Sequence, residues 1–370
     1  MKMRKFGSIA EVSALGFGAM RLPTQGNAVD EAEAVKMIRY AIDNGVNYVD
    51  TAYRYHDGES ELTVGKALKD GYRSKTFLAT KLPVWIVKTT EDYDEILNDQ
   101  LKRLQTDYID FYLFHSIGGK TLDNLFRLEL FDKMLQAKAA GKIRHIGFSF
   151  HDDYDAFVKI IDSWDKWEFC QVQYNYMDTK NQAETRGLEY AASKGIPVIV
   201  MEPVLGGKLA NAPESVQKMF DSHKVKRAPV QWALDFVWNR PEVSLLLSGM
   251  SNMQQLKENL EYADKAEQNV FTEEDFALLE IVKDEYKRLR PVPCTDCKYC
   301  LPCPKKVNIP ANFRIYNDTF AFGLEASRGG YFWIKSESAQ LCVGCKQCEA
   351  KCPQKIEISS LMPKVHERLA

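Results

Sequence analysis

Apolar and polar positions alternate along the first part of the chain with two different periods. After Asp30, apolar residues recur at helical spacing from Ala34 to Ile42, and Gly45 follows them. Asp30 and Glu33 have the spacing of a helix N-terminal capping box. A short apolar run then leads to Asp50, and its length and apolar residues predict a buried strand. This order of helix, glycine and strand recurs later in the chain.

Short apolar runs predict eight strands. They lie near residues 14–19, 46–50, 76–81, 108–114, 143–149, 168–174, 196–201 and 243–248. Strands that alternate with helical stretches indicate a parallel sheet. Because eight such units fit into about 265 residues, we predict an α/β fold that is a closed (β/α)8 TIM barrel, and not an open doubly wound sheet.

The chain changes character after a final predicted helix at residues 272–289. The sequence Arg290-Pro291-Val292-Pro293 ends that helix, because proline cannot continue it. Beyond this point cysteine, proline and short polar turns dominate. We therefore predict two domains, a barrel at residues 1–290 and a second, small domain at residues 291–370.

Charge and hydropathy exclude several classes of partner. The net charge of −2 indicates neither a nucleic acid nor an anionic membrane as partner. No apolar stretch approaches the ~18 residues needed to span a bilayer. Glu11 and several glycines interrupt what would have to be the apolar region of a signal peptide. We expect a cytoplasmic protein.

Cysteine is concentrated in the C-terminal part of the chain. Eight of the nine cysteines lie between residues 294 and 352, and in a reducing cytosol this clustering favours metal ligation over disulfides. Cys170, in an apolar run, is interpreted as a small buried strand residue. The eight form two motifs that both end in Cys-Pro: Cys294-x2-Cys297-x2-Cys300-x2-Cys303 and Cys342-x2-Cys345-x2-Cys348-x3-Cys352.

Three cysteines spaced in this way can surround one [4Fe–4S] cluster, while the fourth reaches the other cluster. This pattern assigns Cys294, Cys297, Cys300 and Cys352 to one cluster, and Cys342, Cys345, Cys348 and Cys303 to the other. The first motif has two residues before its last cysteine where three are usual, so the crossing of ligands stays open there. The alternative is two structural zinc sites, which usually show two separated CxxC pairs.

Four residues that suit proton transfer come at or just after predicted strand ends. They are Asp50, Tyr55, Lys81 and His115, and the C-terminal ends of barrel strands are where such folds build their sites. The four resemble the catalytic tetrad of the aldo/keto reductases. The resemblance covers about residues 1–265 and rests on further segments: Val12 to Gly18, Asp50-Thr51-Ala52, Thr80-Lys81, Leu113-Phe114-His115, Ile143 to Ser149 and Gln255 to Leu260. With its cysteine-rich end, the whole chain resembles the ferredoxin-bearing branch of that family. This resemblance implies that residues 291–370 form a small ferredoxin-like α-helical iron–sulfur domain.

The resemblance implies reduction of a carbonyl, or oxidation of an alcohol, with NAD(P)H. Tyr55 would donate the proton, although a free phenol has a pKa of about 10. Lys81 would lower the pKa of Tyr55 by stabilising the phenolate, and Asp50 would hold Lys81 charged and in place. His115 would hydrogen-bond the carbonyl and orient it.

The family's cofactor contacts carry over in part. Ser149 and Gln171 match positions that bind the nicotinamide carboxamide, but Phe150 stands where an asparagine is usual, and Met201 where an aromatic residue stacks. Gly249, Gln255, Glu258 and Asn259 match further cofactor positions. No Arg or Lys stands between residues 249 and 256, where many relatives bind the 2′-phosphate, so the choice between NADH and NADPH stays open.

Three functional interpretations follow. The first is a carbonyl reductase whose two [4Fe–4S] clusters transfer electrons, with a one-electron carrier protein as partner, or serve structure. The second is a one-electron iron–sulfur oxidoreductase with a vestigial nicotinamide site. The third is a redox sensor or electron-transfer protein. His56 and His151 are candidates for a substrate pocket or for ordinary loop polarity, and Trp85 and Phe150 suggest a partly apolar pocket.

Overall fold

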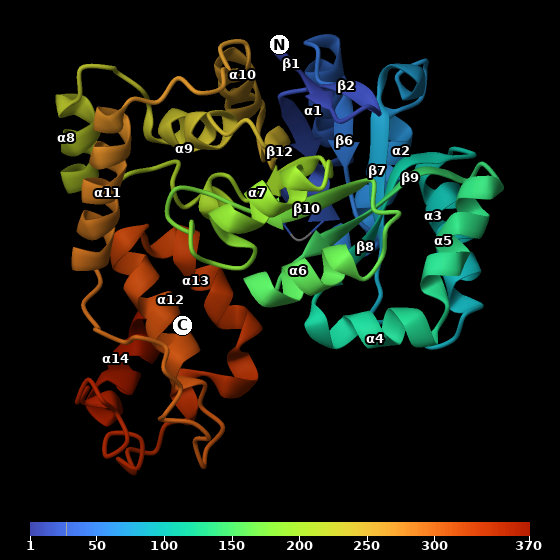
Figure 1. The fold of residues 1–370 in the computed structure, drawn as a ribbon. Coiled ribbons are helices and arrows are strands. Elements are labelled where there is room, and N and C mark those ends of the chain that lie inside the picture. Colours follow the sequence, from blue (N-terminus) through green and yellow to red (C-terminus); the bar gives the residue numbers. More distant parts are fainter. Residues whose placement is uncertain (27) are drawn as a thin grey trace. The chain divides into compact units, whose positions relative to one another are not determined.

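The computed structural model describes residues 1–26 and 28–370. The chain forms two compact units (Figure 1). The first contains Met1–Gly206 and Gln231–Val270, and the second contains Gly207–Val230 and Phe271–Ala370. The second unit therefore includes two helices that precede residue 291, α8 (Glu214–Ser222) and α11 (Glu273–Arg288). The domain boundaries expected from the sequence stay a prediction.

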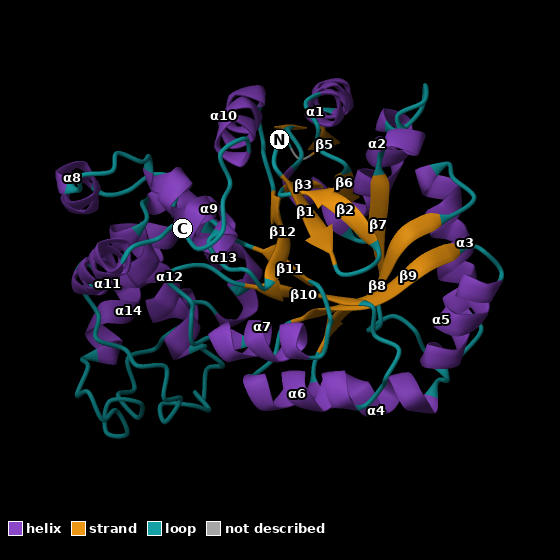
Figure 2. Cartoon of the chain, turned by 45° about the horizontal axis from the view of Figure 1, so that its top comes forward, coloured by secondary structure: helices purple, strands orange, loops and turns teal. Residues whose placement is uncertain are grey.

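Eight parallel strands close into a barrel in the first unit, in the order β10-β11-β12-β3-β6-β7-β8-β9. Figure 2 shows these strands with helices around them. The strands are β3 (Leu15–Gly18), β6 (Tyr48–Asp50), β7 (Phe77–Leu82), β8 (Ile109–Ile117), β9 (Ile143–Phe150), β10 (Phe169–Gln173), β11 (Val198–Met201) and β12 (Val243–Ser248). All eight predicted strands are present, and the predicted (β/α)8 barrel is confirmed.

Amphipathic helices connect the strands, and local signals fix their ends. The carboxylate of Asp30 accepts a hydrogen bond from the backbone nitrogen of Glu33, at 3.2 Å, and so caps α1. The side chain of Glu33 instead pairs with Lys36, so only this half of the expected capping box is formed. The helices of this part of the chain are α1 (Glu31–Asp43), α2 (Glu59–Ala67), α3 (Asp92–Leu104), α4 (Gly119–Arg127), α5 (Leu130–Ala139), α6 (Tyr154–Asp162), α7 (Glu184–Ser193), α9 (Pro229–Trp238) and α10 (Met253–Ala263).

An N-terminal hairpin, which the sequence pattern did not reveal, adds to the barrel core. Its strands are β1 (Met3–Phe6) and β2 (Ala10–Ser13). Phe6 is fully buried and contacts the rings of Phe111 and Phe169, with centroids 5.1 and 5.8 Å away. These two rings come from β8 and β10, so the hairpin packs against the apolar interior of the barrel.

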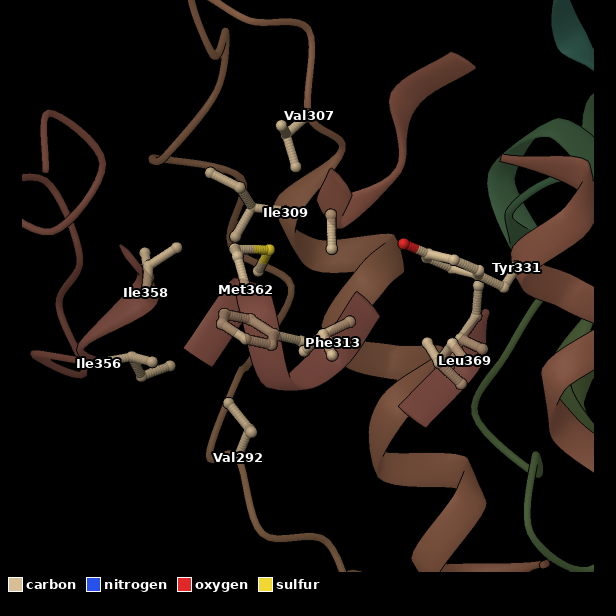
Figure 3. Packing of buried hydrophobic residues seen from close by; sticks show 12 residues of the cluster. Val292, Val307, Ile309, Phe313, Tyr331, Ile356, Ile358, Met362 and Leu369 are labelled. Carbon is tan, nitrogen blue, oxygen red and sulfur yellow. The ribbon is translucent and has the colours of Figure 1, made fainter. Parts of the chain in front are cut away.

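The second unit is helical and has its own apolar core, shown in Figure 3. Phe313 and Met362 are fully buried in it, and six cysteines pack against it. The unit also contains α12 (Ile309–Ala321), α13 (Leu324–Trp333) and α14 (Ile358–Leu369). The predicted helical character of the C-terminal domain is confirmed.

Across residues 1–26 and 28–370, every helix falls short of the length and apolar character that a membrane crossing requires.

The packing of Phe6 yields a test of the barrel core. Truncation by Phe6→Ala leaves a cavity among Phe111, Phe169 and their neighbours, so we expect the free energy of unfolding to fall by about 3 kcal/mol in urea denaturation. Met3→Ala, on the same strand but 44% exposed, is the matched control and should change it by less than about 0.5 kcal/mol. Equal effects of the two variants would contradict the described packing.

Candidate active site and cysteine centre

Three adjacent strands and one loop bring the predicted tetrad together. Asp50 is the last residue of β6, Lys81 lies in β7 and His115 lies in β8, and these strands are neighbours in the barrel. Tyr55 begins the short helix η2 (Tyr55–Gly58), which follows β6. The four residues therefore share the C-terminal rim of the barrel.

Lys81 is the centre of this cluster. Its ammonium is fully buried and donates to Asp50 Oδ1 at 2.6 Å and to the carbonyl oxygen of Thr51 at 2.8 Å. It also lies 3.4 Å from the hydroxyl of Tyr55. Thr51 was not predicted, because it contributes a backbone atom, which side-chain type does not reveal.

Burial and charge oppose each other at the Tyr55 hydroxyl. Burial raises the pKa of Tyr55 above its usual value, and the charge of Lys81 lowers it, while Asp50 and Glu202 raise it. Lys81 acts in the predicted direction, but the net shift of the Tyr55 pKa is upward. Desolvation of the phenolate outweighs the attraction of the ammonium.

Burial also acts on both members of the ion pair. It raises the pKa of Asp50, against the lowering effect of Lys81. The pKa of Lys81 is raised overall because Asp50 and Tyr55 outweigh the desolvation of the ammonium. The second oxygen of Asp50, Oδ2, is buried and has no hydrogen-bond partner among the described residues.

His115 faces the same space as Tyr55. Their rings meet edge to face with centroids 5.9 Å apart, and the ring of Trp85 lies 5.0 Å from His115. The pairing of β8 with β9 shifts register between Phe114 and Ile117, and such bulges re-aim side chains near active sites. Burial, Lys81 and His151 hold the pKa of His115 well below its usual value, so the ring is neutral at pH 7.

The two further histidines that the sequence suggested, His56 and His151, differ in their contacts. The ring nitrogen Nε2 of His56 accepts a hydrogen bond from the backbone nitrogen of Leu22 at 3.2 Å. His56 and Asp57 have left-handed φ angles of 50° and 53°, a costly conformation that the surroundings must maintain. Burial lowers the pKa of His151, and the nearby side chain of Gln182, a residue that the sequence did not suggest, opposes that shift.

A pair of amide and hydroxyl groups lies opposite each other in the barrel wall. Ser149 in β9 and Gln171 in β10 are register partners. Ser149 Oγ accepts a hydrogen bond from the backbone nitrogen of Ser116 at 2.8 Å. Gln171 Nε2 contacts the sulfur of Met201 at 3.5 Å, while Gln171 Oε1 is buried without a partner among the described residues. This orphan acceptor fits the amide donor of a nicotinamide carboxamide.

The remaining predicted cofactor residues are engaged in local structure. Gly249 lies against the side chain of Arg21, where a Cβ atom would come within 3.0 Å of it. Gln255 Oε1 accepts from Ser251 N at 2.9 Å, and Asn259 donates to Ser248 Oγ at 3.0 Å. Glu258 accepts from Gln254. These contacts shape the loop after β12 and the start of α10.

Four cysteines line one hollow in the second unit. Cys294, Cys297, Cys300 and Cys352 lie together in its lining, next to apolar side chains that include Ile309 and Phe313. Burial, with Cys294, Cys348 and Cys297 nearby, raises the pKa of the Cys300 thiol to about 11. The structure thus brings together the set that the sequence assigned to the first cluster, including Cys352 from the second motif.

The second set of cysteines lies alongside. Burial, followed by Glu349 and the thiols of Cys342 and Cys303, raises the pKa of Cys348. Both motifs continue alike, since Lys306 and Lys355 have φ angles of 60° and 52° and hydrogen-bond back to Cys303 and Cys352. A helix follows each of them, α12 or α14.

A TIM barrel with this rim, joined to a helical unit with two cysteine motifs, defines a class of iron–sulfur oxidoreductase. Comparison with known families makes this specific. Residues 14–284 match the aldo/keto reductase family, and residues 293–357 match the 4Fe-4S dicluster domain. The chain belongs to the aldo/keto reductase family and to its ferredoxin-bearing branch.

Individual relatives are similar over the barrel. L-galactose dehydrogenase of Arabidopsis thaliana is 28% identical over 309 residues, which cover 78% of this chain and 96% of the relative. An uncharacterized oxidoreductase of Bacillus subtilis, YqkF, is 28% identical over 78% of this chain and all of its own length. An aldo-keto reductase from Klebsiella pneumoniae, solved in complex with NADPH, is 25% identical with a TM-score of 0.64; the match covers 76% of this chain and 95% of that one.

The buried ion pair yields a prediction with a pH dependence. Lys81→Met leaves Asp50 buried without its cation, which we expect to cost about 3 kcal/mol of stability at neutral pH. The pKa of Asp50, already raised by burial, rises further. A carboxylate whose pKa is higher in the folded than in the unfolded protein disfavours folding above that pKa, and the effect vanishes as the pH falls toward the unfolded value of about 3.9.

The stability difference between Lys81→Met and wild type should therefore shrink as the pH falls from 8 to 5 in urea titrations. Lys133→Met removes a lysine from the pair with Asp94, which is half exposed, and should show little pH dependence. A penalty for Lys81→Met that grows on acidification would contradict the ion-pair assignment.

Proposed function

We propose that this protein reduces a carbonyl substrate, or oxidises the corresponding alcohol, with NAD(P)H at the barrel mouth. The observation that carries the proposal is the contact of one buried ammonium, Lys81, with both the Asp50 carboxylate and the Tyr55 hydroxyl. A nicotinamide cofactor, when bound, supplies or accepts the hydride. The chain's own residues must then manage the proton and the charge on the oxygen.

Tyr55 is proposed as the general acid that protonates the carbonyl oxygen. Its phenolate forms next to Lys81, whose charge Asp50 maintains, so the developing negative charge meets a fixed positive one. His115 is neutral because its pKa is depressed. Its ring can therefore donate a hydrogen bond to the substrate oxygen without competing as an acid.

The cofactor would be held by residues whose side chains offer hydrogen-bonding groups at the barrel rim. Ser149 and Gln171 would bind the carboxamide, with Met201 beside the ring, and the buried Gln171 Oε1 is the group that fits best. Gly249, Gln255, Glu258 and Asn259 would shape the site of the remaining dinucleotide. A related Klebsiella pneumoniae structure contains NADPH, and the choice between NADH and NADPH in this chain is left to titration.

The cysteines are proposed to hold two [4Fe–4S] clusters, which supply single electrons when bound. Cys294, Cys297, Cys300 and Cys352 would hold one cluster, and Cys342, Cys345, Cys348 and Cys303 the other. Since a hydride carries two electrons and each cluster moves one, the clusters either exchange electrons with a one-electron carrier protein or stabilise the unit. Chemistry of this kind suits the reducing cytoplasm, where we place the protein.

A second candidate function is one-electron iron–sulfur chemistry, or redox sensing, with a vestigial nicotinamide site. Phe150 and Met201, which replace the usual asparagine and aromatic residue, favour it. Anaerobic titration with NADH and with NADPH separates the candidates. Tight binding with carbonyl turnover selects the reductase, and reduction of the clusters by a low-potential donor alone selects the second function.

The role of Tyr55 can be tested directly. Tyr55→Phe removes the proton donor but keeps the ring, so we expect carbonyl reduction to fall by about 10²–10⁴-fold. The visible absorption of the clusters and the affinity for NADPH should not change. The matched control is Tyr72→Phe, which removes an exposed hydroxyl that donates to Asp43, and it should retain full activity. Full turnover by Tyr55→Phe would remove the tetrad assignment.

The assignment of the cysteines predicts a pattern of cluster loss. Cys352→Ala and Cys300→Ala should each remove the cluster assigned to the first motif. Cys303→Ala and Cys345→Ala should each remove the cluster assigned to the second motif. Iron content should fall from about eight to about four atoms per chain in each variant, with one of two EPR signals lost. Cys170→Ala, at a buried cysteine in β10, is the control and should keep both signals. Loss of the Cys303 cluster in Cys352→Ala, with the other cluster retained, would disprove the crossed ligation.

A further inference from the structure

A buried carboxylate that the proposed reaction does not use lies behind the active site. Glu61 is in the first turn of α2, and its side chain is fully buried. Burying a carboxylate is costly unless its oxygens are paired. Each oxygen of Glu61 faces a different part of the active-site framework.

The first oxygen holds the strand that carries Lys81. Glu61 Oε1 accepts hydrogen bonds from Thr80 Oγ1 and from Gln100 Nε2, both at 2.7 Å. Gln100 Nε2 also donates to the carbonyl oxygen of Lys81 at 3.1 Å. Tyr112 in turn donates to Gln100 Oε1 at 2.7 Å and fixes the amide. Glu61 and Gln100 together therefore hold the backbone at Lys81.

The second oxygen faces the group that holds the loop of Tyr55. Glu61 Oε2 lies 3.5 Å from Arg103. Arg103 donates to the carbonyl oxygen of Tyr53 at 3.4 Å, and its guanidinium lies over the Tyr53 ring, 4.1 Å from the centroid. Asp99 pairs with Arg103 at 2.6 Å and accepts from the Tyr53 hydroxyl at 3.0 Å. Tyr53 precedes Tyr55 by two residues, so this contact fixes the approach of the loop.

We propose that Glu61 is a positioning residue that joins the strand of Lys81 to the loop of Tyr55 and so sets the distance between ammonium and phenol. The proposal rests on the proposed carbonyl reduction. The distance from Lys81 Nζ to the Tyr55 hydroxyl, 3.4 Å, is at the long end of the hydrogen-bond range, so a further displacement of a few tenths of an ångström removes the bond. A misplacement of about 1 Å can lower a rate about 10²-fold, so we expect a smaller shift at Tyr55 to lower the rate measurably.

Glu61→Gln is the first test, because glutamine keeps the shape and loses the charge that attracts Arg103. We expect kcat for carbonyl reduction to fall about tenfold, while KM for NADPH changes less than about twofold. Arg103→Met breaks the same connection from the other side, at a residue that is partly exposed. If Glu61 and Arg103 act through the same contact, the double variant should lower kcat by less than the two single effects combined.

The matched control is Asp110→Asn. Asp110 is another buried carboxylate; it pairs with Arg73 at 2.8 Å and Arg144 at 3.0 Å and accepts from the backbone nitrogen of Leu78. It lies near the start of β8, away from the rim. A merely structural role for Glu61 predicts that Glu61→Gln and Asp110→Asn lower the melting temperature and leave the pH profile of kcat unchanged.

A second readout does not depend on turnover. The charged groups that act on Tyr55 are Lys81, Asp50 and Glu202, and Lys81 is the one that favours the phenolate. With tyrosine labelled at ¹³Cζ, and the Tyr55 signal identified by its loss in Tyr55→Phe, the pKa of Tyr55 should rise in Glu61→Gln and Arg103→Met. It should stay constant in Asp110→Asn.

An unchanged Tyr55 pKa in both Glu61→Gln and Arg103→Met, or an equal change in Asp110→Asn, would overturn the positioning role. If wild type reduces no carbonyl, the proposed function fails, and the NMR titration still decides the role of Glu61. If Glu61→Gln does not fold, kcat and the pKa of Tyr55 measured in Arg103→Met test the proposal instead.

Discussion

The need to compensate one buried ammonium organises the rim of the barrel. Lys81 is fully enclosed, so its charge must be met by nearby acceptors, and the structure supplies the Asp50 carboxylate and the Thr51 carbonyl at short distance. Tyr55 completes the set at a longer distance. Because the carboxylate and the carbonyl belong to consecutive residues at the end of β6, one strand end satisfies most of the charge. The phenol then meets a cation that is already held in place.

The two ends of the barrel serve different purposes. Next to the N-terminal hairpin the interior of the barrel is apolar, and Phe6 of the hairpin packs against the rings of Phe111 and Phe169. At the rim the same strands carry polar groups with incomplete hydrogen bonding, such as Asp50 Oδ2, His115 Nδ1 and Gln171 Oε1. Unsatisfied buried groups are costly, and a bound cofactor and substrate would satisfy them. The packed interior supplies the stability that such a rim requires.

The second unit shows the same division on a smaller scale. Its apolar core of Phe313, Met362 and their neighbours lies beneath two loops that carry the cysteines. In both loops, Cys-Pro is followed by a lysine whose backbone has a left-handed conformation, and then by a helix. Thiolates on such loops suit one-electron chemistry, whereas the barrel rim suits transfer of a hydride and a proton.

The sequence by itself determined the architecture and the chemical types. The periods of apolar residues located all eight barrel strands, because burial on both faces leaves a clear local signal. Residue type and position at strand ends pointed to Asp50, Tyr55, Lys81 and His115, and cysteine spacing pointed to the clusters. The tertiary structure decided what depends on residues distant in the chain. It showed that Thr51 contributes a backbone oxygen to Lys81, that burial outweighs Lys81 in setting the pKa of Tyr55, and that Cys352 joins the first motif. It also revealed the hairpin around Phe6 and the contacts of Glu61, since desolvation and hydrogen bonding between distant segments leave no periodic signal in the sequence.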